Sequence, residues 1–326
     1  MAELTMLEAI TLALREELAR DPSVVLIGED IGRKGGVFGA TRGLQREFGE
    51  LRVMDAAIAE VGIAGMAIGA ACAGLRPVAE FQFADYILPA FDQIVNEAAT
   101  LSYRSNGAYA CPVVFRAPCG AGVHGGLYHS QSVETFFVHV PGLKVVVPSN
   151  PTDARGLLKS AIRDDNPVVF LEHKGSYRRE RGEVPAGDVT EPLGRARVVR
   201  EGSDVSVVTY GVGVRWAREA AASLEAEGVS AEIVDLRTVH PFDREAVARS
   251  VTKTSRAVVV HEANKTLGAG AEVAAFLAEE LFEALDAPVA RVAAKDSHVP
   301  YALAQETAIV PGVADVVAAV RQVVGF

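Results

Sequence analysis

The chain has 326 residues, of which 49% are hydrophobic and 23% charged, and its formal net charge is −10. Such a length exceeds one ordinary core and predicts two domains of about 150 residues each. The negative charge, with no basic run to offset it, argues against a nucleic-acid partner, and no stretch approaches the ~18 uninterrupted apolar residues of a membrane span.

The three cysteines are Cys72, Cys111 and Cys119. Their odd number and lack of metal-ligand spacing argue against a disulfide framework or a structural metal site. The N-terminal residues lack the basic start and apolar core of a signal peptide. We therefore expect a cytoplasmic protein.

The first half of the chain alternates helices with short buried strands. Apolar residues at helical spacing predict a helix over 5–20, and a β-branched run predicts a strand over 24–27. Further helices are predicted over 61–73, 86–102 and 151–163, and further strands over 77–80, 112–116, 144–147 and 168–171. Continuous Val, Ile and Leu runs between helices indicate a parallel sheet covered on both faces.

A polar stretch with Gly and Pro over 179–193 is typical of a linker. A second series follows, with strands predicted over 204–210, 231–236 and 257–260 and helices over 214–227, 243–251, 270–285 and 313–324. The predicted fold class is α/β, with two doubly wound parallel-sheet domains over 1–185 and 195–326.

Ligands of open parallel sheets bind at the carboxyl ends of the strands. Glu29 and Asp30 follow the first strand in a glycine-rich turn, which is either a solvated loop or part of a site. The turn is not a P-loop because no Gly-Lys-Ser/Thr closes it. Aromatic residues over 81–86 follow another strand, either as core or as a cofactor platform.

Glu60 opens a helix whose next ten residues are all apolar or glycine. It is either an exposed first-turn residue favoured by the helix dipole or a desolvated functional acid. His129 lies in a polar loop beside Ser130 and Gln131, so it is either an acid–base group or a structural loop histidine. His124 lies nearby, but no acidic or cysteine ligands accompany the pair, which argues against a metal site.

Many segments, in this order, resemble the β subunits of the thiamine-diphosphate-dependent 2-oxo acid dehydrogenases, the branched-chain type more than the pyruvate type. They include Gly28-Glu29-Asp30, Glu80-Phe81-Gln82-Phe83-Ala84-Asp85-Tyr86, Phe91-Asp92-Gln93-Ile94-Val95-Asn96-Glu97, Tyr128-His129-Ser130-Gln131-Ser132, Pro141-Gly142-Leu143-Lys144 and Asp235-Leu236-Arg237-Thr238. The resemblance covers nearly the whole chain. It implies a transketolase-like pyrimidine-binding domain over 1–185 and a transketolase C-terminal-like domain over 195–326 for subunit pairing and core docking.

The resemblance also implies which residues form the site. Glu60 is then the carboxylate that hydrogen-bonds the pyrimidine ring of thiamine diphosphate. The pyrimidine wall is completed by Glu29, Ile58, Ala59, Gln82 and Tyr86. His129 is expected to supply a proton during acyl transfer to a lipoyl group. Substrate is expected to be bordered by Phe83, Ala84, Asp85, Tyr86, Tyr128, His129, Ser130 and Gln131. A structural monovalent cation, such as K⁺, is expected at Val113, Val114, Ala161, Asp164 and Asn166.

Enzymes that use thiamine diphosphate hold its diphosphate and Mg²⁺ through a Gly-Asp-Gly motif. This sequence lacks that motif. The resemblance therefore implies that an α subunit holds them, in an assembly of two α and two β chains. It also implies a dihydrolipoyl acyltransferase core as a second partner. Relatives commonly carry Leu-Ser-Glu where this chain has Ile58-Ala59-Glu60, and other residues where it has 263–267.

The expected substrate is a branched-chain 2-oxo acid of the 2-oxoisovalerate type. Pyruvate or acetoin chemistry is the alternative within the family, because an acyl pocket separates substrates by only ~1–3 kcal/mol per methylene. A non-catalytic assembly and docking subunit is the alternative of another class, but such a chain would be expected to have lost Glu60 or His129. A stand-alone transketolase-type enzyme would need the missing diphosphate motif.

Overall fold

The computed structural model describes residues 2–326, which form two compact units. Unit 1 contains the residues up to 119 together with 136–193, and unit 2 contains 120–135 together with 194–326. The segment 120–135 therefore groups with unit 2, although it lies inside the range expected for the first domain.

Unit 1 is built on a parallel sheet with the strand order β6-β7-β5-β4-β2-β3. These strands are β2 (Val24–Gly28), β3 (Val53–Asp55), β4 (Arg76–Glu80), β5 (Val114–Cys119), β6 (Lys144–Val146) and β7 (Val168–His173). A separate antiparallel pair joins β1 (Ala2–Thr5) to β8 (Arg181–Val184). The expected linker over 179–193 thus contains a strand.

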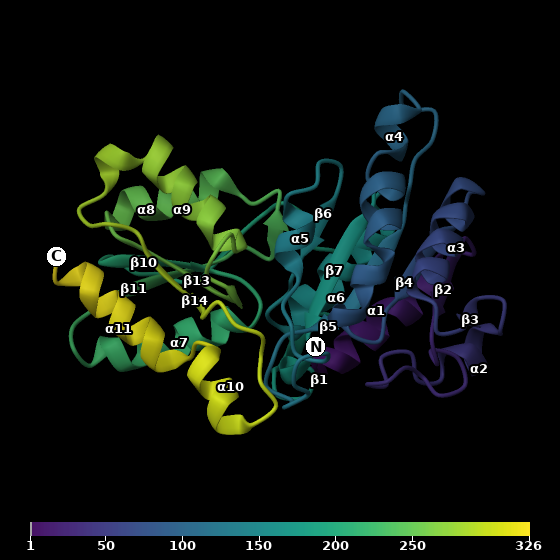
Figure 1. Cartoon of the computed structure of the whole chain (residues 1–326), viewed down its shortest axis with the longest axis horizontal. Coiled ribbons are helices and arrows are strands. Elements are labelled where there is room, and N and C mark those ends of the chain that lie inside the picture. The colour runs from purple at the N-terminus through teal and green to yellow at the C-terminus, as the bar shows by residue number, and fades with distance from the viewer. Residues whose placement is uncertain (1) are drawn as a thin grey trace. The chain divides into compact units, whose positions relative to one another are not determined.

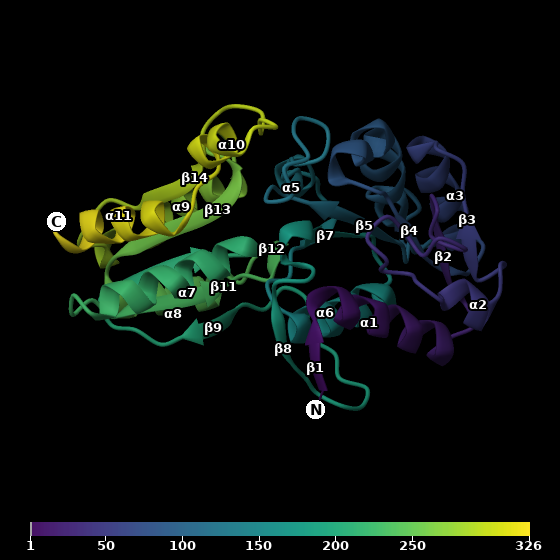
Figure 2. The same cartoon turned by 90° about the horizontal axis from the view of Figure 1, so that it is seen from below.

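Helices cover both faces of this sheet, as expected for a buried parallel sheet. Figure 2 shows α1 (Met6–Arg20) and α6 (Pro151–Arg163) on one face and α3 (Glu60–Cys72) on the other. Thr5 starts α1 through a capping box with Glu8, and Asn150 caps α6 with Pro151 as its first residue. The remaining short helices of this unit are α2 (Leu44–Phe48), α4 (Leu101–Arg104), α5 (Glu134–Val138), which begins in unit 2, and η3 (Lys174–Ser176).

The single helix expected over 86–102 is wrong. The structure has a 3₁₀ helix, η1 (Ala84–Ala90), then a π-helical turn, η2 (Gln93–Ala98), and then α4. Pro89 lies inside η1, and a proline cannot donate a backbone hydrogen bond inside an α-helix. The apolar spacing was read correctly as helical, but the proline changes the kind of helix.

Unit 2 has the strand order β14-β13-β10-β11-β9, with β9 antiparallel to β11 and the other neighbours parallel. Figure 1 shows α8 and α9 on one face of this sheet and α7 and α11 on the other. The strands are β9 (Arg197–Arg200), β10 (Val205–Thr209), β11 (Ala231–Asp235), β13 (Ala257–Asn264) and β14 (Ala290–Ala294), with a short β12 (Thr238–His240). The helices are α7 (Val212–Glu225), α8 (Arg244–Thr254), α9 (Ala269–Glu280), η4 (Phe282–Ala284), α10 (Leu303–Ile309) and α11 (Val313–Val324). The α/β class with two doubly wound domains is confirmed, with one antiparallel edge strand added.

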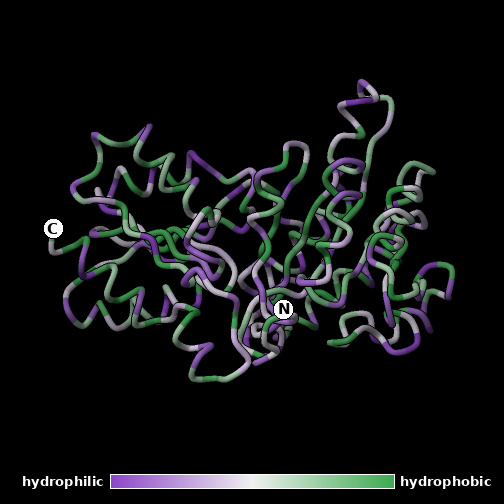
Figure 3. The backbone as a smooth tube through the Cα atoms, in the orientation of Figure 1, coloured by the Kyte–Doolittle hydropathy of each residue, from purple (hydrophilic) through white to green (hydrophobic). Residues whose placement is uncertain are grey.

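Residues 303–324 are long and apolar enough, by composition, to cross a membrane. In the structure they form two helices, α10 and α11, with Pro311 between them. Val316, Val320 and Val323 of α11 are buried in the core of unit 2. Hydrophobic residues likewise follow the strands of both units (Figure 3). The apolar character of α11 therefore reflects packing on a sheet.

A buried ion-pair network joins three neighbouring strands of unit 1. Arg116 on β5 donates to Glu80 on β4 at 2.6 Å and to both oxygens of Glu172 on β7 at 2.6 and 2.8 Å. The hydroxyl of Tyr177 donates to Glu172 at 2.5 Å. Burial raises the pKa of Glu80. The negative charges of Glu172 and Glu80 raise the pKa of Arg116, so the guanidinium stays charged.

We predict that Arg116→Met destabilises the protein strongly, because it leaves two buried carboxylates without their cation. Loss of one partner from a buried ion pair costs about 3–5 kcal/mol. Chemical denaturation followed by circular dichroism measures this. Arg249→Met is the control, since Arg249 pairs with Glu245 at 3.0 Å on the surface of α8 and such pairs contribute about 0.5 kcal/mol. A loss no larger than that of the control would contradict the prediction.

Candidate active site

The carboxyl ends of β2, β3 and β4 lie side by side at one edge of the unit 1 sheet. Gly28, the last residue of β2, is paired with Asp55 of β3 and with Glu80 of β4. A Cβ atom at Gly28 would lie 2.7 Å from the Glu80 carbonyl oxygen, so the backbones approach too closely for a larger residue. The predicted residues that follow these strands are Glu29, Ile58, Ala59, Glu60, Gln82, Phe83, Ala84, Asp85 and Tyr86.

Glu29, Glu60 and Tyr86 interact electrostatically at this edge. Burial raises the pKa of Glu29, and the negative charges of Asp30 and Glu60 raise it further. Burial also raises the pKa of Tyr86, with further contributions from Asp85, Glu60 and Glu29. The structure thus brings together the strand-end acids that the sequence predicted. An acid in such surroundings is suited to a hydrogen bond with a heterocyclic ring nitrogen.

Aromatic rings form a wall beside these acids. The ring centroid of Phe83 lies 5.6 Å from that of Tyr86 and 5.5 Å from that of Phe38. The ammonium group of Lys174 lies 6.0 Å from the Phe83 ring centroid. Of these four residues, the sequence singled out only Phe83 and Tyr86.

The start of α3 presents apolar side chains to solvent. Ile58 is 77% exposed, Val61 49% and Met66 46%. Gly62 and Gly69, on the same helix, are also exposed. Because Glu60 lies among these residues, the carboxylate at the predicted site borders an uncovered apolar surface of the kind that marks protein–protein contacts.

Tyr128, His129, Ser130 and Gln131 lie in unit 2, in the segment 120–135. The backbone N–H of His129 donates to the Gly126 carbonyl at 3.2 Å, and the side-chain amide of Gln131 donates to the Leu127 carbonyl at 3.0 Å. Tyr128 is exposed, His129 is half-buried and Ser130 is buried. The segment is therefore an ordered loop that leaves Tyr128 accessible.

Several oxygen atoms of the five residues predicted to hold a monovalent cation already accept hydrogen bonds. The Val113 carbonyl accepts the Val168 N–H at 3.0 Å, and the Ala161 carbonyl accepts the Asp164 N–H at 3.3 Å. Lys144 donates to the Asp164 carboxylate at 2.5 Å, and Asn166 donates to its other oxygen at 2.9 Å. Val114 lies in the β5 ladder. The cation at Val113, Val114, Ala161, Asp164 and Asn166 stays a prediction.

Within residues 2–326, no group of three or more His, Cys, Asp or Glu side chains could hold a metal ion.

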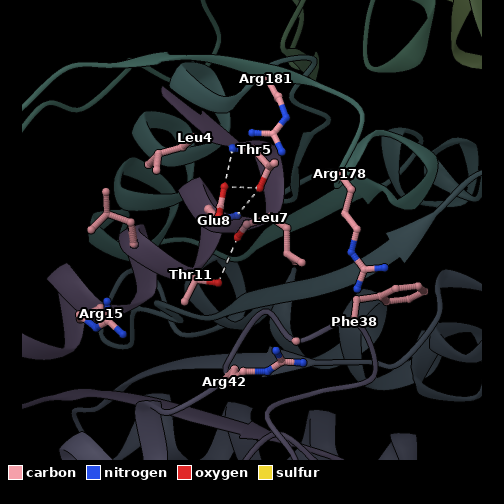
Figure 4. A pocket seen from close by; sticks show the side chains of 12 residues that line it. Leu4, Thr5, Leu7, Glu8, Thr11, Arg15, Phe38, Arg42, Arg178 and Arg181 are labelled. Atoms are coloured by element: carbon pink, nitrogen blue, oxygen red, sulfur yellow. Dashed lines mark hydrogen bonds between the residues drawn. The ribbon is translucent and has the colours of Figure 1, made fainter. Parts of the chain in front are cut away.

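Sequence reasoning missed the basic cavity of unit 1, about 610 Å³ in volume, which is drawn in Figure 4. Its walls combine apolar side chains of α1 with Arg15, Arg42, Arg178 and Arg181. Phe38 contributes to this cavity and to the aromatic wall. These arginines come from three separate parts of the sequence, near 15, 42 and 180, so no local motif could have revealed the cavity. Nor could a motif reveal the network of Glu80, Arg116 and Glu172, although charged residues within strongly apolar strands were a visible signal.

The comparisons with known proteins agree with this geometry. Residues 2–180 match the family described as the transketolase pyrimidine binding domain, and residues 194–316 match the transketolase C-terminal domain. The chain is 52% identical to the β subunit of 2-oxoisovalerate dehydrogenase of Bacillus subtilis, with all of both chains covered. The chain belongs to the β subunits of the 2-oxo acid dehydrogenases.

Other members of the family are nearly as similar. The β subunits of the pyruvate dehydrogenase E1 components of B. subtilis and Staphylococcus aureus are 49% and 46% identical over the full length of each chain. A solved structure described as a split-gene transketolase, an inactive β4 tetramer, superposes with a TM-score of 0.78 at 28% identity, covering 99% of this chain and 98% of that one. Among these relatives the branched-chain type is somewhat more similar than the pyruvate type.

We predict that Glu60→Gln lowers the pKa of Glu29, because it removes one of the negative charges that raise it. The pKa of Glu29 can be followed by NMR titration of labelled carboxyl carbons in the isolated chain. Glu50→Gln, at an exposed position between α2 and β3, serves as the control. An identical Glu29 titration in wild type and Glu60→Gln would show that the two carboxyl groups do not interact.

Proposed function

We propose that this β subunit, together with an α subunit, decarboxylates a branched-chain 2-oxo acid of the 2-oxoisovalerate type. The observation that carries the proposal is the grouping of Glu29, Glu60 and Tyr86 beside the aromatic wall, at the open edge of a pyrimidine-binding domain. The substrate assignment is supported by the 52% identity to a 2-oxoisovalerate dehydrogenase β subunit. The 49% identity to a pyruvate dehydrogenase β subunit makes pyruvate the second candidate.

The residues of unit 1 fit the aminopyrimidine half of thiamine diphosphate. An acid at Glu60 suits a ring nitrogen, the Phe83 and Tyr86 rings suit an aromatic face, and the exposed Ile58 suits an apolar contact. Gln82 and Ala59 would complete the wall. When bound, this cofactor supplies the nucleophile and the electron sink that decarboxylation of a 2-oxo acid requires. The diphosphate and Mg²⁺ would be held by the α subunit, because Gly-Asp-Gly is missing here.

We propose the following roles for the chain's own residues. Glu60 would hold a hydrogen bond to the ring nitrogen, and Glu29 and Tyr86 would fix the position of the ring. Phe83 and Asp85 would exclude water from the substrate. In the transfer step the lipoyl disulfide is the oxidant. One sulfur forms the bond to the acyl carbon while the sulfur–sulfur bond breaks, and His129 gives a proton to the other sulfur.

The exposed apolar start of α3 supports a partner chain at this position. Ile58, Val61 and Met66 would be covered by the α subunit, which would close the site around Glu60. An assembly of two α and two β chains, docking of an acyltransferase core on unit 2 and a cytoplasmic location remain proposals. A non-catalytic docking role is not favoured, because the chain retains Glu60 and His129.

The direct test is an assay of 2-oxoisovalerate decarboxylation with thiamine diphosphate and Mg²⁺, for this chain alone and co-expressed with an α subunit. We expect activity only in the pair, a preference for 2-oxoisovalerate over pyruvate, and a loss of about a hundredfold or more in Glu60→Gln, because that variant removes the acid from the cofactor ring. Glu50→Gln should behave as wild type. Activity of the isolated chain would refute the shared site, whereas an active pair that takes only pyruvate would refute the substrate assignment.

A second test concerns the partner surface. We expect Met66→Lys to weaken the pair, because it buries a charge in an apolar contact, and the dissociation constant from analytical ultracentrifugation should rise at least about tenfold. Leu51→Lys changes an apolar residue that is 86% exposed away from α3 and serves as the matched control. If both variants pair equally well with the α subunit, α3 is not part of the contact.

A further inference from the structure

Two glutamates of unit 2 bind the segment 120–135, which carries His129. Glu262 lies on β13 and Glu306 on α10, so the two come from elements far apart in the sequence. Both are nearly inaccessible to solvent, at 8% and 5% exposure. A buried carboxylate needs hydrogen-bond donors, and here the donors come from the loop.

The contacts are short and involve consecutive backbone amides. Glu262 accepts the Ala121 N–H at 2.6 Å and the Ser132 hydroxyl at 3.0 Å through the same oxygen. Glu306 accepts the Gly122 N–H at 3.0 Å, and its second oxygen lies 3.2 Å from Nδ1 of His124. Hydrogen bonds from amides to a charged acceptor are about twice as strong as neutral ones. Glu262 thus joins the start of the loop to its end, and Glu306 holds the residues between Gly122 and His124.

The loop between these contacts has little freedom. The Gly120 N–H donates to the Gln131 carbonyl at 3.0 Å, which closes the loop next to the Glu262 contacts. Gly122, His124 and Gly126 all have positive φ, at 88°, 55° and 68°. A non-glycine residue such as His124 adopts this conformation only when its surroundings favour it, and the Glu306 contact supplies that. Near the end of the segment 120–135, Glu134 accepts the Tyr210 hydroxyl at 2.8 Å.

We propose that Glu262 and Glu306 are positioning residues that hold the loop 120–135 in the conformation in which His129 delivers its proton during acyl transfer. This inference rests on the proposed function. Neither glutamate needs to touch the reacting atoms, because each acts through the backbone of the loop. The consequence is selective: loosening the loop should impair transfer to the lipoyl group more than the preceding decarboxylation, in which Glu60 of unit 1 is the principal acid.

The test uses the co-expressed αβ pair with Glu262→Gln and Glu306→Gln, and with Glu279→Gln as a control at an exposed position on α9. Decarboxylation is measured with an artificial electron acceptor, and acyl transfer with an isolated lipoyl domain. We expect the ratio of transfer to decarboxylation to fall about tenfold in Glu262→Gln, because the neutral amide oxygen accepts the two hydrogen bonds about half as strongly as the carboxylate does. Ser132→Ala, which removes one neutral donor from Glu262, should lower the ratio less.

Amide hydrogen exchange gives a readout that does not depend on activity. Exchange at Ala121 and Gly122 should accelerate in the two Gln variants and stay unchanged in Glu279→Gln. Unchanged exchange together with an unchanged ratio would overturn the proposal, as would an equal loss of both half-reactions with a lower melting temperature. A wild-type pair that decarboxylates no 2-oxo acid would instead refute the proposed function. In that case faster exchange at Ala121 and Gly122 still supports the conclusion that the two glutamates hold the loop, and unchanged exchange overturns it.

Discussion

The ion pairs of Arg116 with Glu80 and Glu172 are the constraint on which the edge of unit 1 depends. One buried guanidinium holds three adjacent strands in register where their carboxyl ends meet. Tyr177 adds a hydrogen bond to Glu172, and its ring centroid lies 5.4 Å from that of Phe38, which in turn contacts Phe83. The aromatic wall beside the predicted cofactor site is therefore fixed by a charge network that itself contacts no predicted ligand. Such networks are costly in desolvation and are stable only when every group has a partner.

Unit 2 also contains buried carboxylates, but their hydrogen-bond donors differ from the guanidinium found in unit 1. There the buried carboxylates of Glu262 and Glu306 accept hydrogen bonds from loop amides and a serine hydroxyl, and Glu306 also contacts the imidazole of His124. A cation would have fixed another side chain, whereas amides fix the backbone itself. The amide contacts constrain the backbone of a segment in which Gly122, His124 and Gly126 have positive φ angles. The same chain thus orders a strand edge through side chains and the segment 120–135 mainly through its main chain.

The sequence predicted the elements whose signals are local. Apolar residues at helical spacing predicted helices over 5–20 and 151–163, and the structure has α1 at Met6–Arg20 and α6 at Pro151–Arg163. The helix expected over 86–102 failed because Pro89 was given too little weight against the apolar spacing. The β1–β8 pair was missed because it joins residues nearly the whole first unit apart. Glu60 and His129 were candidates from the sequence itself, but each also had an ordinary structural explanation, and only the family resemblance gave them roles. The roles of Arg116, Glu262 and Glu306 depend on contacts between segments that are distant in the sequence, and no local pattern predicts such contacts.

The exposed start of α3 supports the proposal that a partner chain completes the site. Glu29 and Tyr86 already have raised pKa values through partial burial, yet Ile58 beside them is 77% exposed. In the proposed pair, the α subunit would displace water from this edge and lower the local dielectric constant. Electrostatic interactions among the acids would then strengthen, because Coulomb energies rise as the dielectric constant falls. The partner would therefore contribute to catalysis in two ways, by holding the diphosphate and by tuning acids that belong to this chain. The apolar face of α3 serves that purpose better than a polar one, since covering it adds burial without adding a competing charge.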